Sequence, residues 1–498
     1  MTTSLSLPPF NYILVNFFTF TLFFLFLLKK STQNRNAKIF FLYGWLFGFG
    51  YFVTNLYWIS ISLSFDQNFK FLIPFTVILI PAFLALFYGI VSYLFIILKS
   101  KKILFSFILF SLIFGIIEFI RGSIFTGFPW NLIVYSFSRQ LEILSITSII
   151  GTYGLNLFCI SLFTSPSIII LKNTKKNVSI CISFFIITGL FYFYGHSYKE
   201  KFYKANDREY EYKVRVIGSN INLDRFYLGA DSNSIIKDLI KLSSPNKNQK
   251  TIFIWPEGIL PNITEKEFSE YKLLFSNYFS EKHLLIIGVN NKSTKDGSIK
   301  YFNSLSIYNH EFDLIDTYNK INLVPFGEFL PFENVLKNIG LKSLTNNYQS
   351  FSSGNLREII KIKKQGFSLQ ILPLICYEII YSGKLISNPS YDLIVNISED
   401  GWFGQSIGPQ QHFDHSVLRA IENRKYILRS ANNGIAAIIN PLGIVEHSVD
   451  FGNSGYVELE ETKIIQPTIF SIYGNKIFGL LILMYILLIF SFNKIRNE

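Results

Sequence analysis

ILPLICYEII, residues 371–380, begins as an apolar run typical of a buried strand, and a single thiol, Cys376, follows directly after that run. Two further strand-like stretches each lead to one charged residue, Glu257 in TIFIWPEGILPN and Lys320 in YNKINLVPFGEF. A cysteine nucleophile needs a base to take its proton and a cation to stabilise the anion that forms. Because catalytic groups gather where strands end at one edge of a sheet, the three stretches predict one catalytic set.

The region around these stretches, residues 205–468, alternates short β-rich runs with amphipathic runs. The expected strands are 214–221, 251–255, 284–289, 304–308, 368–374, 393–397 and 434–439. The expected helices are 234–242, 265–279 and 412–423. Strands interleaved with helices predict a layered α/β domain, and the Asn-Pro-Leu-Gly turn at 440–443 predicts a hairpin.

The parts of the chain that flank this region are far more apolar. Hydrophobic residues make up 50% and aromatic residues 17% of the 498 residues, and the mean hydropathy is +0.32. A membrane-spanning helix needs about 20 apolar residues. Apolar runs of this order cover residues 10–28, 39–63, 71–98, 103–120, 141–171, 178–194 and 477–492. We expect a membrane bundle of about six spans in 1–198, a globular domain in 205–468, and a last span with its tail in 475–498.

The net charge of +12 is distributed in clusters beside the apolar runs rather than in one stripe. Alternate loops hold these clusters, which are Lys29, Lys30, Arg35 and Lys38; Lys99, Lys101 and Lys102; Lys172, Lys175 and Lys176; and Lys494 and Arg496. Short loops rich in Lys and Arg stay in the cytoplasm, so the globular domain is expected outside the cytoplasmic membrane. With no basic-aromatic motif in the sequence, nucleic acid is not an expected partner.

This placement bears on the cysteines, of which the chain has 3. Cys159 and Cys181 fall within expected spans, which leaves Cys376 without a disulfide partner in an oxidising compartment. A solitary exported thiol is either buried and inert or retained for its reactivity. The stretches that carry Glu257 and Lys320 favour the second interpretation, although each of these residues alone also fits a solvated surface charge.

At these residues the chain resembles the nitrilase (carbon–nitrogen hydrolase) superfamily, and more closely the bacterial apolipoprotein N-acyltransferase family. The matching motifs are IWPEG, YNKINLVPFGEFLPF, ICYEII, GWFGQSIGPQQHF and RSANNGIAAIINPLG in the globular region, and GFGYFVTNLYW and RGSIFTGFPWNLIVYS in the membrane part. The resemblance covers nearly the whole chain. It implies a membrane α-helical bundle joined to an α/β nitrilase-like αββα sandwich. It also implies a multi-pass protein of the bacterial inner membrane with its catalytic domain on the periplasmic side.

The same resemblance implies an N-acyltransferase in which Cys376 is the nucleophile, Glu257 the general base and Lys320 the cation that faces the oxyanion. An acyl chain would pass from a membrane phospholipid to a Cys376 thioester, and then to the N-terminal amine of an apolipoprotein that carries diacylglyceryl-cysteine. We expect a monomer without a cofactor. The alternatives are a membrane-tethered amidase, which the family-like membrane half disfavours, and a non-catalytic lipid- or protein-binding scaffold, which the intact triad disfavours.

Further residues match family positions around the site, and these are Glu328, Tyr377, Glu378, Phe226, Trp130 and Trp402. Each has a structural alternative, which is an ion pair with Lys320 or another base for the two carboxylates and packing or membrane anchoring for the aromatic side chains. His412 and His415 stand at i, i+3, but no third ligand has a convincing spacing, so we expect no metal.

Three features depart from the family pattern. Phe226 stands where a Trp is usual, and Glu399 in NISEDGWFG replaces an expected Asn. The family has eight spans where this sequence shows seven, and residues 5–10 resemble only the end of the first of them. We therefore expect that a first span is missing from this sequence. None of these departures touches the catalytic set.

Overall fold

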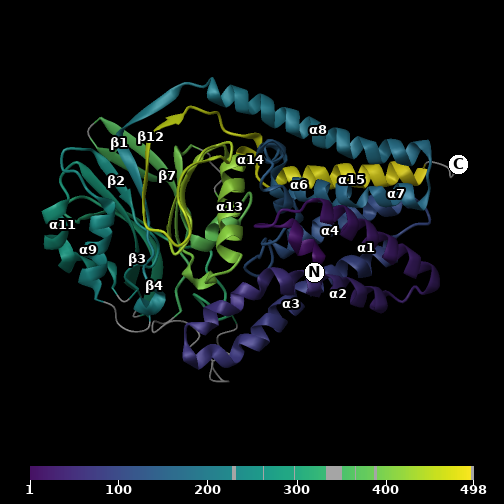
Figure 1. The fold of residues 1–498 in the computed structure, drawn as a ribbon, viewed down its shortest axis with the longest axis horizontal. Coiled ribbons are helices and arrows are strands. Elements are labelled where there is room, and N and C mark those ends of the chain that lie inside the picture. Colours follow the sequence, from purple (N-terminus) through teal and green to yellow (C-terminus); the bar gives the residue numbers. More distant parts are fainter. Residues whose placement is uncertain are drawn as a thin grey trace.

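The computed structural model describes the chain except for residues 227–230, 262, 296–297, 332–349, 365, 386–389 and 495–498. It has a helical half and a double-sheet half that lie side by side (Figure 1). The chain begins in the helical half, crosses into the sheets after α8, and returns to the helices with α15 (Figure 1). The two halves correspond to the strongly apolar and the mixed regions of the sequence.

The helical half consists of segments with no continuous polar face. Its helices are α1 (Leu14–Gln33), α2 (Ala37–Leu56), α3 (Ile73–Leu98), α4 (Ile103–Arg121), α5 (Leu141–Leu144), α6 (Thr147–Thr164), α7 (Pro166–Leu171), α8 (Lys175–Tyr203) and α15 (Lys476–Lys494). Among the described residues, six helical segments are long and apolar enough to cross a membrane, and Lys476–Phe492 is a shorter apolar helix. Helices that are apolar all round are stable only in a bundle core or in lipid, which is why these runs assemble here.

Two glycine features shape this half. Gly44 and Gly48 of α2 face Tyr88 of α3, where a Cβ on either glycine would collide with the Tyr88 residue. Small residues therefore allow the two helices to approach closely. The longest apolar run, 141–171, contains a break, because Gly151 has a φ of +70° that a continuous helix does not permit.

Within the described residues, the second half forms two six-stranded sheets, in the orders β12-β1-β2-β3-β4-β5 and β11-β10-β9-β8-β7-β6. The first contains β1 (Asp207–Gly218), β2 (Thr251–Ile254), β3 (His283–Lys295), β4 (Ser298–Tyr308), β5 (Leu314–Asn319) and β12 (Gly455–Lys463). The second contains β6 (Ile360–Lys364), β7 (Phe367–Ile375), β8 (Leu393–Glu399), β9 (Tyr426–Asn432), β10 (Ala436–Ile439) and β11 (Val445–Val449). β1, β2 and β3 pair in parallel, as do β7, β8 and β9, so the carboxyl ends of each set meet at one edge.

Helices cover the outer faces of both sheets (Figure 1). α9 (Ser232–Ser243), α10 (Glu265–Phe268) and α11 (Lys272–Tyr278) pack on the first sheet, and α13 (Gly408–Asn423) lies between the second sheet and the helical half. An apolar layer fills the space between the sheets. The structure thus confirms the expected membrane bundle and αββα sandwich. One hydrophobic cluster runs from the second sheet and α13 into the bundle, so the two halves share a core.

The strands and helices expected from the sequence are present, except that the single helix expected at 265–279 is divided into α10 and α11 by a 3-10 turn at Ser269–Tyr271. The expected turn at 440–443 joins β10 to β11 as a hairpin. The sequence pattern does not predict β6, β9 or β12, and it indicates β5 only as the strand-like run before Lys320. β9 shows the reason most clearly, because Arg429, Ser430 and Asn432 are fully buried in it. Polar side chains that hydrogen bond inside a core interrupt the apolar pattern by which a buried strand is recognised.

Candidate active site

Cys376 lies where β7 gives way to a short 3-10 helix, η8 (Cys376–Ile380). Its φ is +49°, a left-handed conformation that a residue with a Cβ adopts only when its surroundings hold it there. Glu378 supplies part of that constraint, because its Oε2 accepts the backbone N–H of Ile375 at 2.9 Å. The turn leaves the thiol at the carboxyl edge of the sheets, where the charges of Glu257 and Lys320 act on it.

Glu378 is fully buried and connects the Cys376 turn to the end of β5. Its Oε1 accepts the backbone N–H groups of Ile321 and Asn322 at 2.9 and 3.1 Å. The same oxygen accepts the Tyr318 hydroxyl and an N–H of Arg357, each at 2.7 Å. Burial alone would raise the pKa of Glu378, but Arg357 and these donors hold the pKa below its usual value. Its ion-pair partner is Arg357, not Lys320.

Glu257 follows β2 and Lys320 follows β5, and the structure brings their side chains together. Lys320 Nζ lies 3.4 Å from Glu257 Oε1 and 3.0 Å from Glu328 Oε1. Asn303 of β4 joins the two carboxylates, because its Nδ2 donates to Glu257 Oε1 at 2.7 Å and to Glu328 Oε1 at 2.8 Å. Glu328 Oε2 in turn accepts the backbone N–H of Val324 at 2.8 Å, which ties the Pro-Phe-Gly-Glu turn to Lys320.

The second oxygen of Glu257 is also fixed. Its Oε2 accepts the backbone N–H of Glu399, at the end of β8, at 3.0 Å. Gly288 of β3 allows this placement, because a Cβ there would lie 2.6 Å from both the Glu257 Cα and the Pro256 carbonyl oxygen. Glu257 is 6% exposed and Lys320 1% exposed, so neither is a solvated surface charge.

The charges around Cys376 set its protonation state. Burial is the main reason that the pKa of Cys376 lies well above its usual value, and the charge of Glu257 adds to this against the opposing charge of Lys320. Burial acts to lower the pKa of Lys320, but the carboxylates of Glu257 and Glu328 outweigh it and raise the pKa. At neutral pH the thiol is therefore protonated and Lys320 is charged. A neutral thiol beside a carboxylate suits general-base activation.

A second buried polar cluster lies behind Cys376. Asp400 Oδ1 accepts the Ser398 hydroxyl at 2.7 Å and is 2.8 Å from His412 Nδ1, while His412 Nε2 is 3.3 Å from the Cys376 carbonyl oxygen. Donor atoms of Cys376, Asp400 and His412 lie within 4.8 Å of one another, a spacing that a metal ion could use. Arg429 Nη2, 2.7 Å from Asp400 Oδ2 and 3.1 Å from His412 Nδ1, already supplies a positive charge there.

His412 and His415, which stand at i, i+3 in α13, have different polar partners in the described structure. His415 Nδ1 hydrogen bonds to the Tyr135 hydroxyl in the helical half. Both histidine rings instead contact Trp130, with ring centroids 5.5 Å away for His412 and 4.9 Å for His415.

A loop of the helical half, Thr-Gly-Phe-Pro-Trp at 126–130, lies against the nucleophile turn. The Tyr377 hydroxyl donates to the Gly127 carbonyl oxygen at 2.9 Å, and the Tyr381 hydroxyl donates to that of Thr126 at 2.8 Å. Trp130 is 1% exposed, and its Nε1 donates to Gln411 Oε1 of α13 at 2.8 Å. The loop is thus fastened to both η8 and α13.

Arg121, at the end of α4, holds the same loop from the membrane side. Its Nη1 donates to the carbonyl oxygens of Phe128 and Trp130, and its Nη2 forms a buried ion pair with Glu118. The two Nη atoms of Arg121 are thus satisfied inside the bundle, while its Nε and Glu118 Oε1 have no hydrogen-bond partner in the described structure. The described contacts therefore give these two charges a structural task in the loop.

Phe226 and Trp402 lie at the rim of this edge. Their ring centroids are 4.9 Å apart, and Trp402 also lies 6.2 Å from Phe65, in the connection between α2 and α3. The neighbouring Phe403 packs against Trp58 of that connection at 4.8 Å. Aromatic side chains from both halves thus meet beside the nucleophile turn.

The unexpected Glu399 has a partner of its own. Its Oε2 pairs with Arg225 and accepts an N–H of Asn432 at 2.7 Å, and its Oε1 accepts the Gly401 backbone N–H at 2.9 Å. Arg225 Nη2 and Nε also reach the carbonyl oxygen of Gly258, at 3.1 and 3.2 Å, in the turn that follows Glu257. The substitution is therefore accommodated by an ion pair that braces the Glu257 turn.

Several residues of the site lie outside the sequence prediction, and these are Asn303, Arg357, Ser398, Asp400 and Arg429. Asn303 and Arg429 lie within strands, where a polar residue gives no periodic signal for a distant partner. Arg357 precedes β6, a strand that the pattern does not predict. Their positions depend on strand pairing between segments far apart in the chain, which sequence spacing alone does not specify.

The double-sheet domain, with a thiol and buried charges at its carboxyl edge and a shared core with a helical bundle, defines a membrane protein with a carbon–nitrogen hydrolase domain. Residues 242–459 match the family model described as carbon-nitrogen hydrolase. Residues 1–163 match the model described as the apolipoprotein N-acyltransferase N-terminal domain. The chain belongs to the apolipoprotein N-acyltransferase family and is an acyltransferase.

The relatives that support this assignment match along nearly their whole length. An apolipoprotein N-acyltransferase of Rickettsia typhi is 32% identical over 479 residues, which cover 94% of this chain and 92% of the relative. One of Rhodopseudomonas palustris is 29% identical over 503 residues, which cover 98% and 92%.

Solved structures align with about half of the chain. An amidase from Nesterenkonia sp. AN1 is 12% identical with a TM-score of 0.35, covering 51% of this chain and 92% of that protein. A nitrilase-superfamily member from Saccharomyces cerevisiae is 17% identical with a TM-score of 0.34, covering 50% and 90%.

Proposed function

We propose that Cys376 carries an acyl group from a membrane phospholipid to the N-terminal amine of a diacylglyceryl-cysteine apolipoprotein, with Glu257 as general base and Lys320 as the oxyanion-stabilising cation. One observation carries this proposal: the half-buried Cys376 thiol, in a strained turn, lies within the fields of the Glu257 carboxylate and the Lys320 ammonium, which are fixed beside each other. Membership of the acyltransferase family and the shared core with the helical bundle support a lipid as the acyl donor.

In the first half-reaction, Glu257 accepts the Cys376 proton while the sulfur attacks the ester carbonyl carbon of the phospholipid. The oxyanion that forms faces Lys320 and a backbone N–H near Tyr377. The ester C–O bond then breaks, and the departing lysophospholipid oxygen takes the proton from Glu257. The products are a lysophospholipid and a Cys376 thioester.

In the second half-reaction, the uncharged amine of the apolipoprotein attacks the thioester carbon. Glu257 accepts the proton that the nitrogen loses, and Lys320 again faces the oxyanion. The C–S bond breaks, and the leaving sulfur recovers a proton from Glu257. The products are an N-acyl apolipoprotein and a free Cys376 thiol, so protons balance over the cycle.

The supporting residues have separate tasks in this proposal. Glu328 holds Lys320, and Glu378 holds the nucleophile turn. Tyr377 and Trp130 keep the membrane loop against the site. The aromatic pair of Phe226 and Trp402 would line the acyl chain.

A two-step labelling experiment tests the proposal. The full-length protein is incubated with phospholipid labelled in its acyl chain, and then a diacylglyceryl peptide with a free N-terminus is added. We expect a hydroxylamine-sensitive acyl-enzyme that disappears as N-acyl peptide forms, in wild type and in the Cys181→Ser control but not in Cys376→Ser. Wild-type rates of N-acyl peptide formation in Cys376→Ser would refute the mechanism, and release of free fatty acid alone would assign a hydrolase.

We further propose that the domain of 205–468 lies on the periplasmic side of the inner membrane, between a bundle of 1–198 and a last span of 475–498. The alternating basic clusters and the six candidate spans support this orientation. In a Cys376→Ala background, Lys241→Cys places a thiol at an exposed position of α9. A membrane-impermeant maleimide should label it in intact spheroplasts, and labelling only after lysis would reverse the orientation.

A further inference from the structure

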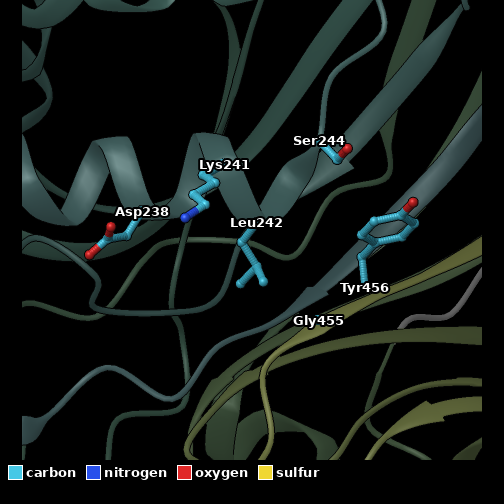
Figure 2. A pocket seen from close by; sticks show the side chains of 6 residues that line it. All are labelled: Asp238, Lys241, Leu242, Ser244, Gly455 and Tyr456. Atoms are coloured by element: carbon cyan, nitrogen blue, oxygen red, sulfur yellow. The ribbon is translucent and has the colours of Figure 1, made fainter.

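Two hollows of similar size lie in the sheet half, and they differ in charge. The first, of about 380 Å³, is lined by Asp238, Lys241, Leu242, Ser244, Gly455 and Tyr456 (Figure 2). The charges of its one lysine and one aspartate cancel. The second, of about 360 Å³, is lined among the described residues by Arg208, Tyr210, Asp392, Arg424, Lys425, Tyr426, Pro441, Thr462, Lys463, Ile464 and Ile465. Four cationic side chains and one carboxylate line this second hollow. Arg208 pairs with Asp392 and Lys463 pairs with Asp207, so Arg424 and Lys425 are the two cations left without an ion pair among the described residues.

The basic hollow is distinct from the Cys376 site. Asp392 immediately precedes β8 and Tyr426 begins β9, so the hollow lies at the amino ends of these parallel strands. The nucleophile turn and Glu399 lie at their carboxyl ends. The length of a strand therefore separates the two places, and a ligand in the hollow does not occupy the catalytic edge.

The hollow lies where the chain passes between its two halves. Arg208 is at the start of β1, just after α8, and Ile465 lies between β12 and α14 (Ile469–Tyr473), which leads into α15 (Figure 1). α8 is one of the candidate spans, and α15 contains the shorter apolar helix. Both connections leave apolar helices at this point, so a bilayer around these helices would have its surface near the hollow.

Arg424 is the most unusual cation of this hollow, because it is 2% exposed and has no ion pair within the described part of the chain. Its Nη1 donates to the Pro441 carbonyl oxygen at 3.1 Å, and its Nη2 donates to that of Ser145 at 3.3 Å. The guanidinium lies 3.4 Å from the ring centroid of Tyr198 in α8, and its Nε has no hydrogen-bond partner in the described structure. A buried guanidinium without a carboxylate is an expensive arrangement unless an anion comes near.

Lys425 adds a second cation without a described carboxylate partner. Its Nζ donates to the Tyr391 carbonyl oxygen. Arg208 is paired with Asp392, the one carboxylate that lines the hollow. Burial lowers the pKa of Lys425, and Arg208 lowers it further while Asp392 opposes this. An anion in the hollow would stabilise the charged form of Lys425 and so oppose the lowering of its pKa by burial and by Arg208.

We propose that this basic hollow binds a phosphate group, presented by the headgroup of an anionic phospholipid at the bilayer surface. Arginine and lysine together suit phosphate oxygens, because the guanidinium offers several donors in a fixed plane and the ammonium adds a compact charge. The bilayer supplies such headgroups at the level of the hollow, where basic residues near the surface attract them. The bound lipid would fasten β1, β9 and β12 to the ends of α8 and α14 without entering the catalytic cycle.

The test uses the full-length protein and ether-linked lipids, which cannot donate an acyl chain. Detergent-solubilised protein is incubated with equal amounts of ether-linked phosphatidylglycerol and phosphatidylcholine, and native mass spectrometry counts the molecules retained. We expect selective retention of phosphatidylglycerol by wild type, and a loss of roughly fivefold in Lys425→Gln and in Lys463→Gln, the effect of one basic charge near a membrane surface. Lys241→Gln, in the hollow of Figure 2, should retain as much as wild type.

The possible outcomes separate clearly. Equal retention by wild type, Lys425→Gln and Lys463→Gln would overturn the proposal, as would an equal loss in Lys241→Gln. If inorganic phosphate raises the melting temperature of wild type but not of Lys425→Gln, while no phosphatidylglycerol is retained, free phosphate is the ligand and the lipid assignment is wrong. Acyl transfer measured with ester-linked lipid checks that each variant is folded, and its failure in wild type would refute the proposed function alone.

Discussion

The carboxyl edge of the sheets and the α13 interface with the bundle both bury ionised side chains, yet they hold them differently. At the edge, Glu257 and Lys320 are fixed by a few bonds and also act on a nearby thiol. At the interface, Glu422 Oε1 accepts from Ser382 and from Thr152 of α6 while its Oε2 pairs with Arg419. The charged groups at the edge can act on a reacting group, whereas those at the interface only hold the two halves of the protein together. Substitutions should therefore separate chemistry from stability.

The largest expected effect is at the edge. Glu257→Gln keeps the shape of the side chain and one of its two acceptor oxygens but removes the base, so acyl-enzyme formation should fall about 10³-fold. The melting temperature should stay close to that of wild type, because Lys320 retains Glu328 as an ion-pair partner. Intact-protein mass spectrometry over time measures the acyl-enzyme. Glu460→Gln, which removes an exposed carboxylate paired with Lys213, is the matched control. Acyl-enzyme forming at the wild-type rate would exclude Glu257 as the base.

At the interface the expected effect is on folding. Glu422→Gln leaves Arg419 buried without its charged partner, so the free energy of unfolding should fall by about 3 kcal/mol. The folded fraction should keep kcat/KM for acyl transfer within about threefold of wild type. Thermal unfolding in detergent and active-site titration of the surviving protein measure the two quantities. A loss of kcat/KM as large as that in Glu257→Gln, without a fall in stability, would abolish the distinction between the two regions.

How far the sequence predicts this division depends on the kind of residue. Cys376, Glu257 and Lys320 each follow a strand-like run, so local pattern and strand-edge geometry predict that they gather. Glu422 and Arg419 are separated by one helical turn, and nothing in that spacing indicates that Thr152 of the bundle completes the pair. The sequence predicts both halves of the fold, because apolar runs and alternating strands and helices are local properties. It misses the connections between the layers, because these depend on which distant surfaces meet.

Asp414 of α13 differs from Glu422, because it is an interface carboxylate with no ion pair among the described residues, and only the more distant charge of Arg139 acts on it. Burial raises the pKa of Asp414 to about 6, against hydrogen bonds from Gln410 and Ser138. An unfolded Asp has a pKa of about 3.9, so the stability linked to this proton is complete below that value and is lost as pH rises to 6. Asp414→Asn should therefore gain about 3 kcal/mol over wild type at pH 8 and little at pH 4.

Melting temperatures of wild type and Asp414→Asn across pH 4 to 8 test this expectation. Asp238→Asn on α9 is exposed and should show no such pH-dependent gain. A gain for Asp414→Asn that is equal at both ends of the range would mean that its cause is packing rather than ionisation. The interface would then bury that carboxylate without cost.

The smallest change in activity is expected at Arg357, which forms a buried ion pair like those of the interface but lies beside the catalytic edge. Arg357 touches no reacting group, but it pairs with Glu378, whose Oε1 fixes the backbone of Ile321 and Asn322 beside Lys320. Arg357→Lys keeps the charge and loses the multiple N–H bonds, so kcat should fall about tenfold while KM for phospholipid is unchanged. Arg357→Met should lose more, because Glu378 would remain buried without its cation.

The comparison of kcat between Arg357→Lys and Arg357→Met shows whether Arg357 positions the site or only stabilises the fold. A purely structural role would lower the melting temperature in both variants and leave kcat per folded molecule intact. A positioning role lowers kcat in both, less in Arg357→Lys, and slows alkylation of Cys376 by iodoacetamide in parallel, because the charge of Lys320 that holds down the pKa of Cys376 is then displaced. The carboxyl edge would in that case depend on a buried ion pair, Arg357 with Glu378, just as the α13 interface depends on Arg419 with Glu422. The two regions would then differ in what the ion pair holds in place, which is Lys320 at the edge and a helix at the interface.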